Sequence, residues 1–175
     1  MALIYLSLGS NIDRQRRITA ALDELAESFG ELLLSSVYES ESVGFKGDSF
    51  YNLVVGIHSS LSVGQVSKIL KSIEDQNGRD RSGPRFGPRS LDIDILTVDD
   101  RVGEIDGIKL PRGEVLKNDF VLLPLAEMAA HSQHPVTGQS YSHHLQQFDK
   151  DKQKLWPVEF IWRGENITLA KSRLL

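Results

Sequence analysis

The spacing of apolar residues changes along residues 2–98, and the order of these changes constrains the fold. Short apolar runs of strand length occupy residues 2–8, 31–38, 50–58 and 90–98. Between them, residues 13–29 and 63–76 carry apolar side chains at helical spacing. The resulting order of strand, helix, two strands, helix and strand predicts an α+β fold. We expect a ferredoxin-like α/β sandwich whose mainly antiparallel sheet is covered by helices.

The pattern is weaker after residue 98. Residues 102–110 favour an edge hairpin, residues 120–130 a helix that starts or kinks near Pro124, and residues 139–147 a short helix. Residues 160–162 favour one more edge strand. The chain has 175 residues, of which 40% are hydrophobic, enough for one compact core. We expect a single domain over residues 1–156 and a C-terminal extension, residues 157–175, that is an edge strand or a partly disordered tail.

Composition excludes several classes of protein. The formal net charge of −4 argues against a generally basic surface, so we expect no nucleic-acid partner. The chain has no cysteine, which rules out disulfides and thiolate metal sites. No apolar run approaches the roughly 20 residues of a membrane helix. The expectation is a cytoplasmic protein with no membrane partner. It would be a monomer, with a dimer through the C-terminal tail as the alternative.

Two aspartates stand one residue apart in an apolar run. Because side chains alternate along a strand, Asp92 and Asp94 share one face and their apolar neighbours share the other. Residues two apart in a strand lie about 7 Å from each other. Mg²⁺ binds one or two protein carboxylates together with substrate phosphates and water. The pair is therefore either the solvated acidic face of a half-buried strand or a magnesium–nucleotide site.

A loop rich in Gly, Pro and arginine precedes the acidic pair. Its arginines are Arg79, Arg81, Arg85 and Arg89. The guanidinium group offers a planar fork of donors that fits phosphate oxygens. Beside two aspartates, these arginines form either a surface ion-pair patch or a grip on a polyphosphate whose other side is neutralised by Mg²⁺. Phosphoryl transfer needs both kinds of charge, because its catalysis is mainly positioning and electrostatics.

The strand expected over residues 50–58 places an amide beside an aromatic ring. Phe50 and Asn52 share one face of that strand. Asparagine is depleted in strands, so Asn52 needs a hydrogen-bond partner. An aromatic plane with an adjacent amide can hold a flat heterocycle by stacking and paired hydrogen bonds. The alternative is an asparagine at a sheet edge that is satisfied by a neighbouring loop.

Several of these stretches resemble those of a known enzyme family. The matching segments are LGSN at residues 8–11, FYN at 50–52 and IEDQNGRDRSGPRFGPRSLDIDIL at 73–96. The last is the most specific, and the later IKLP and PLAEMA also fit. Over roughly residues 2–156, the chain resembles 6-hydroxymethyl-7,8-dihydropterin pyrophosphokinase of folate biosynthesis. The resemblance implies transfer of pyrophosphate from ATP to the hydroxymethyl group of the pterin, with release of AMP and with two Mg²⁺ ions as cofactors.

The resemblance also implies a role for each matching residue. Asp92 and Asp94 would ligate the two Mg²⁺ ions. Arg79 and Arg89 would be catalytic, in contact with the phosphates or the catalytic loop. The substrate-binding residues would be Ser40, Val43, Phe50, Asn52 and Phe120, with the two phenyl rings on either side of the pterin. The nucleotide-binding residues would be Glu74, Arg81, Arg85, Arg112 and Lys117.

The chain departs from the family pattern mainly on the nucleotide side. Arg112 stands where the family usually has His, Gly113 replaces a residue that is commonly Tyr, and Asn118 replaces a phosphate-contacting Arg. Arg112 and Lys117 are candidate replacements for the lost contacts. A charge-assisted phosphate contact contributes about 1.5–3 kcal/mol.

Three hypotheses about function follow. The first is an ATP- and Mg²⁺-dependent pterin pyrophosphokinase. The second is a repurposed or non-catalytic pterin-binding paralogue with an altered phosphate-donor site. The third is an unrelated ferredoxin-like RNA-binding module, against which stands the lack of a basic, aromatic strand face for bases.

Overall fold

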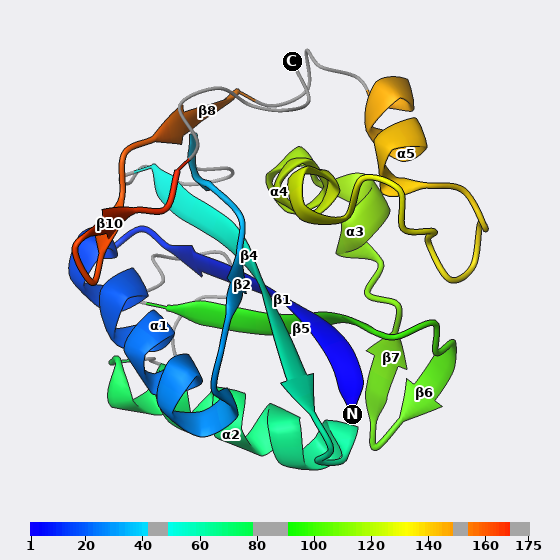
Figure 1. Ribbon diagram of the computed structural model, residues 1–175, viewed down its shortest axis with the longest axis horizontal. Coiled ribbons are helices and arrows are strands. Elements are labelled where there is room, and N and C mark those ends of the chain that lie inside the picture. Colours follow the sequence, from blue (N-terminus) through cyan, green and yellow to red (C-terminus); the bar gives the residue numbers. More distant parts are fainter. Residues whose placement is uncertain (42–48, 79–90, 149–153, 169–175) are drawn as a thin grey trace.

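The computed structural model describes residues 1–41, 49–78, 91–148 and 154–168 (Figure 1). Its centre is a six-stranded antiparallel sheet with the order β5-β1-β4-β3-β8, in which β2 also pairs with β4. The strands are β1 (Ala2–Ser10), β2 (Leu33–Leu34), β3 (Val37–Ser40), β4 (Phe50–Ser59), β5 (Asp92–Val98) and β8 (Leu155–Val158). Helix α1 (Arg14–Phe29) follows β1, and helix α2 (Val63–Gln76) follows β4. This element order and pairing confirm the predicted ferredoxin-like α+β architecture.

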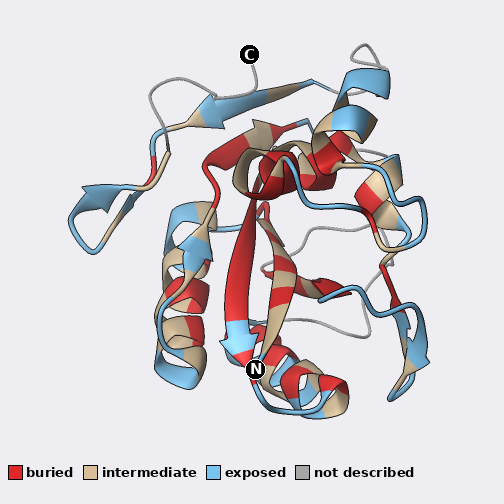
Figure 2. Ribbon diagram, turned by 45° about the vertical axis from the view of Figure 1, so that its right-hand side comes forward, coloured by how far each residue is buried: buried red, intermediate tan, exposed pale blue. Residues whose placement is uncertain are grey.

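Two apolar clusters lie on opposite faces of the sheet (Figure 2). On the first, the α1–α2 face, these helices pack over alternate strand residues such as Leu6, Val55 and Ile93. On the second, the α4 face, helix α4 (Asp119–Ala129) packs over Val54 and Leu96. Helices α3 (Glu114–Lys117) and α5 (Tyr141–Gln147) add Val115 and Tyr141 to the second cluster. Strand residues therefore alternate between two buried layers.

The single strand predicted over residues 31–38 is two short strands, because one extra residue is inserted opposite β4. Leu34 pairs with Val55 and Tyr38 with Asn52, which leaves three residues facing two. Ser35 bridges the break: its amide donates to the Val54 carbonyl at 3.0 Å and its hydroxyl accepts from the Val54 amide at 2.9 Å. Because of this local bulge, the alternation of side chains between the two faces of the sheet changes phase between β2 and β3.

Helix α2 has the predicted bounds. Ser62 and Gln65 form a capping box at its start, with reciprocal bonds of 3.1 and 2.9 Å. The predicted hairpin is also present, as β6 (Gly103–Ile105) and β7 (Ile108–Leu110). Its turn residue Asp106 accepts a hydrogen bond from the Gly64 amide at 2.9 Å, which fastens the hairpin to the beginning of α2.

The C-terminal segment wraps back onto the domain. Strand β8 pairs with β3, so the predicted division after Trp156 falls within a strand of the main sheet. Phe160 is 1% exposed and belongs to the cluster on the α1–α2 face. The edge strand predicted over residues 160–162 is instead part of a separate hairpin of β9 (Ile161–Trp162) and β10 (Glu165–Asn166).

Helix α4 begins at Asp119, as predicted to within one residue, and Pro124 lies inside it. Because proline has no amide hydrogen, Pro124 cannot donate the helical bond to the Phe120 carbonyl. None of the helices in the described part of the chain is long and apolar enough to cross a membrane.

Candidate active site

One row of paired residues crosses the sheet near the end where β4 and β5 begin. Asp92 on β5 pairs with Gly9 on β1, and Gly9 pairs with Asn52 on β4. Asn52 pairs in turn with Tyr38 on β3. Paired residues of an antiparallel sheet project to the same side. Asp92 and Asn52 therefore share the α4 face, about 10 Å apart at two strand spacings.

Gly9 leaves open the space between them. A Cβ built at this position would lie 3.2 Å from the Asn52 Oδ1 atom and 3.8 Å from Cδ1 of Phe50. The apolar run predicts a strand that ends at Leu8, but β1 continues to Ser10, so Gly9 lies within the strand. The functional interest of Gly9 was missed for that reason, because its neighbours in space are distant in sequence.

The acidic pair has the predicted alternation. Ile93 and Ile95 are buried at 4% exposure, whereas Asp92 and Asp94 are half-buried on the α4 face. In the part of the chain that is described, no group of three or more His, Asp or Glu is placed to hold a metal ion. A cation at this pair would thus have two carboxylates and would take its other ligands from phosphate and water, which fits Mg²⁺.

Arg112 lies beside the acidic pair. Its Nη2 atom is 3.6 Å from Oδ1 of Asp94, and its Nε atom is 3.0 Å from Oε2 of Glu114. Its backbone amide donates to the Leu96 carbonyl at 2.8 Å, which anchors the residue to β5. The ion pair itself is more than a third exposed, so it contributes little to stability. It does bring a guanidinium group to the predicted metal site.

Glu74 supports the acidic pair from the other side of the strand. It is 6% exposed on α2, and its Oε2 atom accepts a hydrogen bond from the Ile93 amide at 3.0 Å. Strand β5 is outermost in the sheet order, so this carboxylate satisfies a backbone donor at the sheet edge. Glu74 thereby holds the backbone between Asp92 and Asp94. Its predicted contact with the nucleotide stays a prediction.

Asn52 finds its partner on the neighbouring strand. Its Nδ2 atom donates to the Ser40 Oγ atom at 2.8 Å, and the two residues are 5% and 2% exposed. Ser40 pairs with Phe50 across β3 and β4. The strand asparagine is therefore satisfied by a buried serine rather than by a loop, and an aromatic ring stands next to this pair.

Phe120 approaches the same face from α4. It lies in the first turn of the helix, half-buried against the α4-face cluster. Glu127 ties the helix to β3: its carboxylate accepts from the Tyr38 hydroxyl and from the Ser36 amide, both at 2.6 Å. Phe120 and Phe50 thus come from elements that are fixed to each other. Their placement on either side of a pterin stays a prediction.

Asp119 was not singled out by the sequence. It is 8% exposed, and its Oδ1 atom has no hydrogen-bond partner among the described residues. Burial raises the pKa of this carboxyl, and the nearby backbone amides of Asp119 and Phe120 only partly offset the effect. An aspartate in the first turn of a helix is common, so nothing in the sequence distinguishes it.

Not every predicted residue can be placed. Lys117 is exposed at the end of α3. Five further predicted residues lie outside the described residues, namely Val43, Arg79, Arg81, Arg85 and Arg89.

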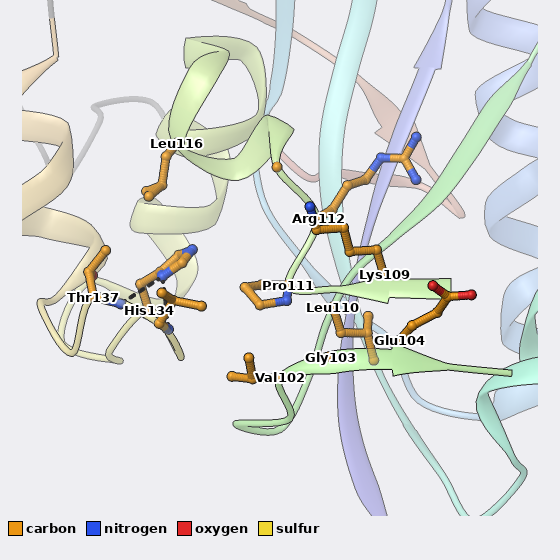
Figure 3. A pocket seen from close by; sticks show the side chains of 12 residues that line it. Val102, Gly103, Glu104, Lys109, Leu110, Pro111, Arg112, Leu116, His134 and Thr137 are labelled. Atoms are coloured by element: carbon orange, nitrogen blue, oxygen red, sulfur yellow. Dashed lines mark hydrogen bonds between the residues drawn. The ribbon is translucent and has the colours of Figure 1, made fainter. Parts of the chain in front are cut away.

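A hollow of about 530 Å³ opens next to Arg112, between the β6–β7 hairpin and the segment that follows α4 (Figure 3). His134 and Thr137 face Pro111 and Val102 across it. Of the predicted site residues that the structure describes, only Arg112 lines it. Neither the acidic pair nor the Ser40–Asn52 pair is among its lining residues. The face that carries the acidic pair and the Ser40–Asn52 pair is therefore the better candidate for phosphoryl-transfer chemistry.

Known proteins with similar sequences point to one enzyme family. Residues 5–130 match the family model described as 7,8-dihydro-6-hydroxymethylpterin-pyrophosphokinase (HPPK). The 2-amino-4-hydroxy-6-hydroxymethyldihydropteridine pyrophosphokinase of Aquifex aeolicus is 36% identical over 138 residues, which cover 78% of this chain and 86% of that protein. The folic acid synthesis protein fol1 of Pneumocystis carinii is 32% identical over 171 residues, 95% of this chain but 23% of that longer protein.

A solved structure supports the fold independently. The crystal structure of Plasmodium falciparum HPPK-DHPS wild type with pteroate matches with a TM-score of 0.62 at 14% sequence identity, over 83% of this chain and 42% of that one. The family-model match covers most of the chain, and it spans the strands that carry Gly9, Asn52 and both aspartates. The chain belongs to the 7,8-dihydro-6-hydroxymethylpterin-pyrophosphokinase family.

Proposed function

We propose that this pyrophosphokinase transfers the terminal pyrophosphoryl group of ATP to the hydroxymethyl group of 6-hydroxymethyl-7,8-dihydropterin, with Mg²⁺ held by Asp92 and Asp94. The observation that supports the proposal is the row Asp92–Gly9–Asn52, which puts a pair of carboxylates and a buried amide on one face. The spacing of about 10 Å between the ends of this row suits a heterocycle at one end and a phosphate at the other.

The Ser40–Asn52 pair would orient the pterin. Because Nδ2 of Asn52 donates to Ser40, its Oδ1 atom is directed toward the open space at Gly9. An oxygen held in this way accepts hydrogen bonds from the amino and ring N–H groups of a heterocycle. Phe50, and Phe120 from α4, would supply the stacking surfaces.

The acidic end would bind the polyphosphate. Bound Mg²⁺ would supply positive charge that neutralises the phosphates and orients them. Arg112 would hold Asp94 in place and offer a further cation to a phosphate oxygen. In the reaction, the substrate hydroxyl oxygen bonds to the β-phosphorus and loses its proton. The bond between the β-phosphorus and the α-phosphate oxygen breaks, and AMP leaves.

The test is AMP formation from ATP, with and without the pterin, in a titration of Mg²⁺. We expect pterin-dependent AMP, and a loss of about a hundredfold or more in kcat for Asp92→Asn and for Asp94→Asn. Asp100→Asn removes the same charge from an exposed turn and serves as the control. Unchanged turnover in both variants would refute the metal assignment.

One other outcome separates the competing hypotheses. Protein that binds the pterin but forms no AMP would favour the repurposed paralogue with an altered donor site. A cytoplasmic location and a monomeric state, both expected from the sequence, stay predictions.

A further inference from the structure

A polar network lies on the α1–α2 face, directly behind the proposed pterin site. Arg14 donates through Nη1 to Oε1 of Glu39 at 2.8 Å. The same nitrogen donates to the carbonyl and hydroxyl oxygens of Ser49, both at 2.9 Å. The Ser49 hydroxyl also donates to Oε1 of Glu39 at 2.6 Å. One guanidinium therefore connects the residue just before Ser40 with the residue just before Phe50.

The C-terminal strand completes this network. Trp156 on β8 pairs with Glu39, and its Nε1 atom donates to Oε2 of Glu39 at 3.1 Å. Glu39 pairs on its other side with Tyr51, whose ring lies 4.0 Å beneath the Arg14 guanidinium carbon. Trp156, Glu39 and Tyr51 thus form a row across three strands, with Arg14 over its end.

The adjacent row carries the substrate residues. Leu155 pairs with Ser40, and Ser40 pairs with Phe50. Strand β3 is only four residues long, so few backbone bonds define its register with β4. A change in register would turn its side chains to the other face and separate Ser40 from Asn52. Contacts at Glu39 are well placed to prevent that change.

We propose that Trp156, Glu39, Arg14 and Ser49 form a positioning network that holds Ser40, Phe50 and Asn52 in place for the pterin. The inference rests on the proposed function, since it assumes that these three residues bind the substrate. Strand β8 lies beyond residues 5–130, the part matched by the family model. The C-terminal segment of this chain would thus take part in substrate binding without touching the substrate.

The charge state of Glu39 is consistent with this arrangement. Burial alone would raise the pKa of its carboxyl. The hydrogen bonds from Ser49, Arg14 and Trp156, together with the Arg14 charge, outweigh burial and hold the pKa below its ordinary value. The carboxylate is therefore ionised at neutral pH and keeps both oxygens as acceptors.

The same segment provides a matched control. Trp162 on β9 donates through Nε1 to Oδ1 of Asp23 at 3.0 Å, and Arg163 lies over its ring at 4.6 Å. This second combination of Trp, Arg and carboxylate attaches the C-terminal hairpin to α1. Neither Asp23 nor its partners lie in the row that pairs with Ser40.

The experiment compares Trp156→Phe and Trp162→Phe, each of which deletes one indole donor to a carboxylate. We expect Trp156→Phe to raise the KM for the pterin about three- to tenfold, with an unchanged KM for ATP. This is less than the full value of a hydrogen bond to a charged group, because the network reaches the substrate only through Ser40, Phe50 and Asn52. Trp162→Phe should leave both constants unchanged. Glu39→Gln should act in the same direction as Trp156→Phe, because it removes the charge that Arg14 binds.

A second measurement needs neither substrate nor activity. The side-chain amide of Asn52 gives its own resonances in a ¹H–¹⁵N spectrum, which are assigned from their absence in Asn52→Asp. These resonances should shift in Trp156→Phe and stay in place in Trp162→Phe. Equal effects of the two tryptophan variants, or none from Trp156→Phe, would overturn the positioning network. If the wild-type protein formed no pterin-dependent AMP, the proposed function would fail, and the amide resonances would still decide the network.

Discussion

At the scale of single residues, the site depends on what is missing as much as on what is present. Gly9 has no side chain where one would touch Asn52 and Phe50. Aspartates and aromatic residues attract notice in a sequence because they carry chemistry. A glycine within a strand is informative only when the pairing of the strands is known.

We predict that Gly9→Ala weakens pterin binding. The new methyl group would lie 3.2 Å from Oδ1 of Asn52, so the amide must turn or retreat. We expect the KM for the pterin to rise about tenfold, equivalent to about 1.4 kcal/mol, with little change in the KM for ATP. Steady-state kinetics with each substrate varied in turn would measure this.

Gly56→Ala is the control for the effect of adding a methyl group to a tightly packed strand outside the site. A Cβ at Gly56 would lie 3.1–3.2 Å from Leu33 and Tyr5, in the part of the sheet away from the acidic pair. This variant should lose stability without a change in the pterin KM. The interpretation of Gly9 fails if both variants raise that constant equally.

We also predict that His134 makes the free energy of unfolding depend on pH. Its Nδ1 atom accepts from the amides of Val136 and Thr137, both at 3.2 Å. Burial, and then the nearby charge of His144, lower the pKa of His134 below 6.5. Between that lowered pKa and 6.5, the unfolded chain binds more protons than the folded one, so stability rises with pH.

The free energy of unfolding should accordingly decrease as the pH falls from 7 through 6.5, until the folded-state pKa is reached. Urea unfolding at a series of pH values would measure the slope. In His134→Gln the slope should be shallower, with the share of His144 remaining because its pKa is lowered too. A slope identical to that of the wild type would exclude His134 as its source.

At the scale of elements, the spacing of apolar residues predicted those features of helices and strands that depend on local sequence. The bounds of α2 follow from its apolar spacing and the Ser62 capping box, and the shared face of Asp92 and Asp94 follows from the alternation of a strand. The split between β2 and β3 did not follow. It arises because Ser35 binds the backbone of Val54, a contact between segments that no local pattern connects.

The candidate site, like the fold, could be predicted from the sequence only in part. The residue types at Phe50, Asn52 and the acidic pair indicated their chemistry, and resemblance to a family assigned their roles. The position of Gly9 between Asn52 and Asp92 depends on how β1 pairs with β4 and with β5. No local sequence pattern predicts this register. The bond from Trp156 to Glu39 spans 117 residues, and the sequence carries no sign of it.

At the scale of the whole molecule, the C-terminal segment contributes to the core. Thr168 accepts from the Val37 amide at 3.0 Å, and Phe160 contacts Tyr51 edge to face at 6.4 Å between ring centroids. If the segment were a tail without contacts to the core, mutations in it would not affect the sheet. These contacts instead join the segment to the same cluster that α1 and α2 bury.

We predict that Phe160→Ala destabilises the entire domain. Deleting a fully buried phenyl ring costs about 3–5 kcal/mol, because the transfer energy is lost and a cavity remains. Ile161→Ala removes a neighbouring apolar side chain that is 43% exposed, so it should cost less than about 1 kcal/mol. Urea unfolding followed by far-UV circular dichroism would show one transition at a lower midpoint for Phe160→Ala and a nearly unchanged midpoint for Ile161→Ala. Because the ring is buried in the α1–α2-face cluster, we expect residues 1–156 and the segment that follows to unfold together. An unchanged midpoint for Phe160→Ala would contradict this expectation, because it would mean that residues 1–156 fold without that segment.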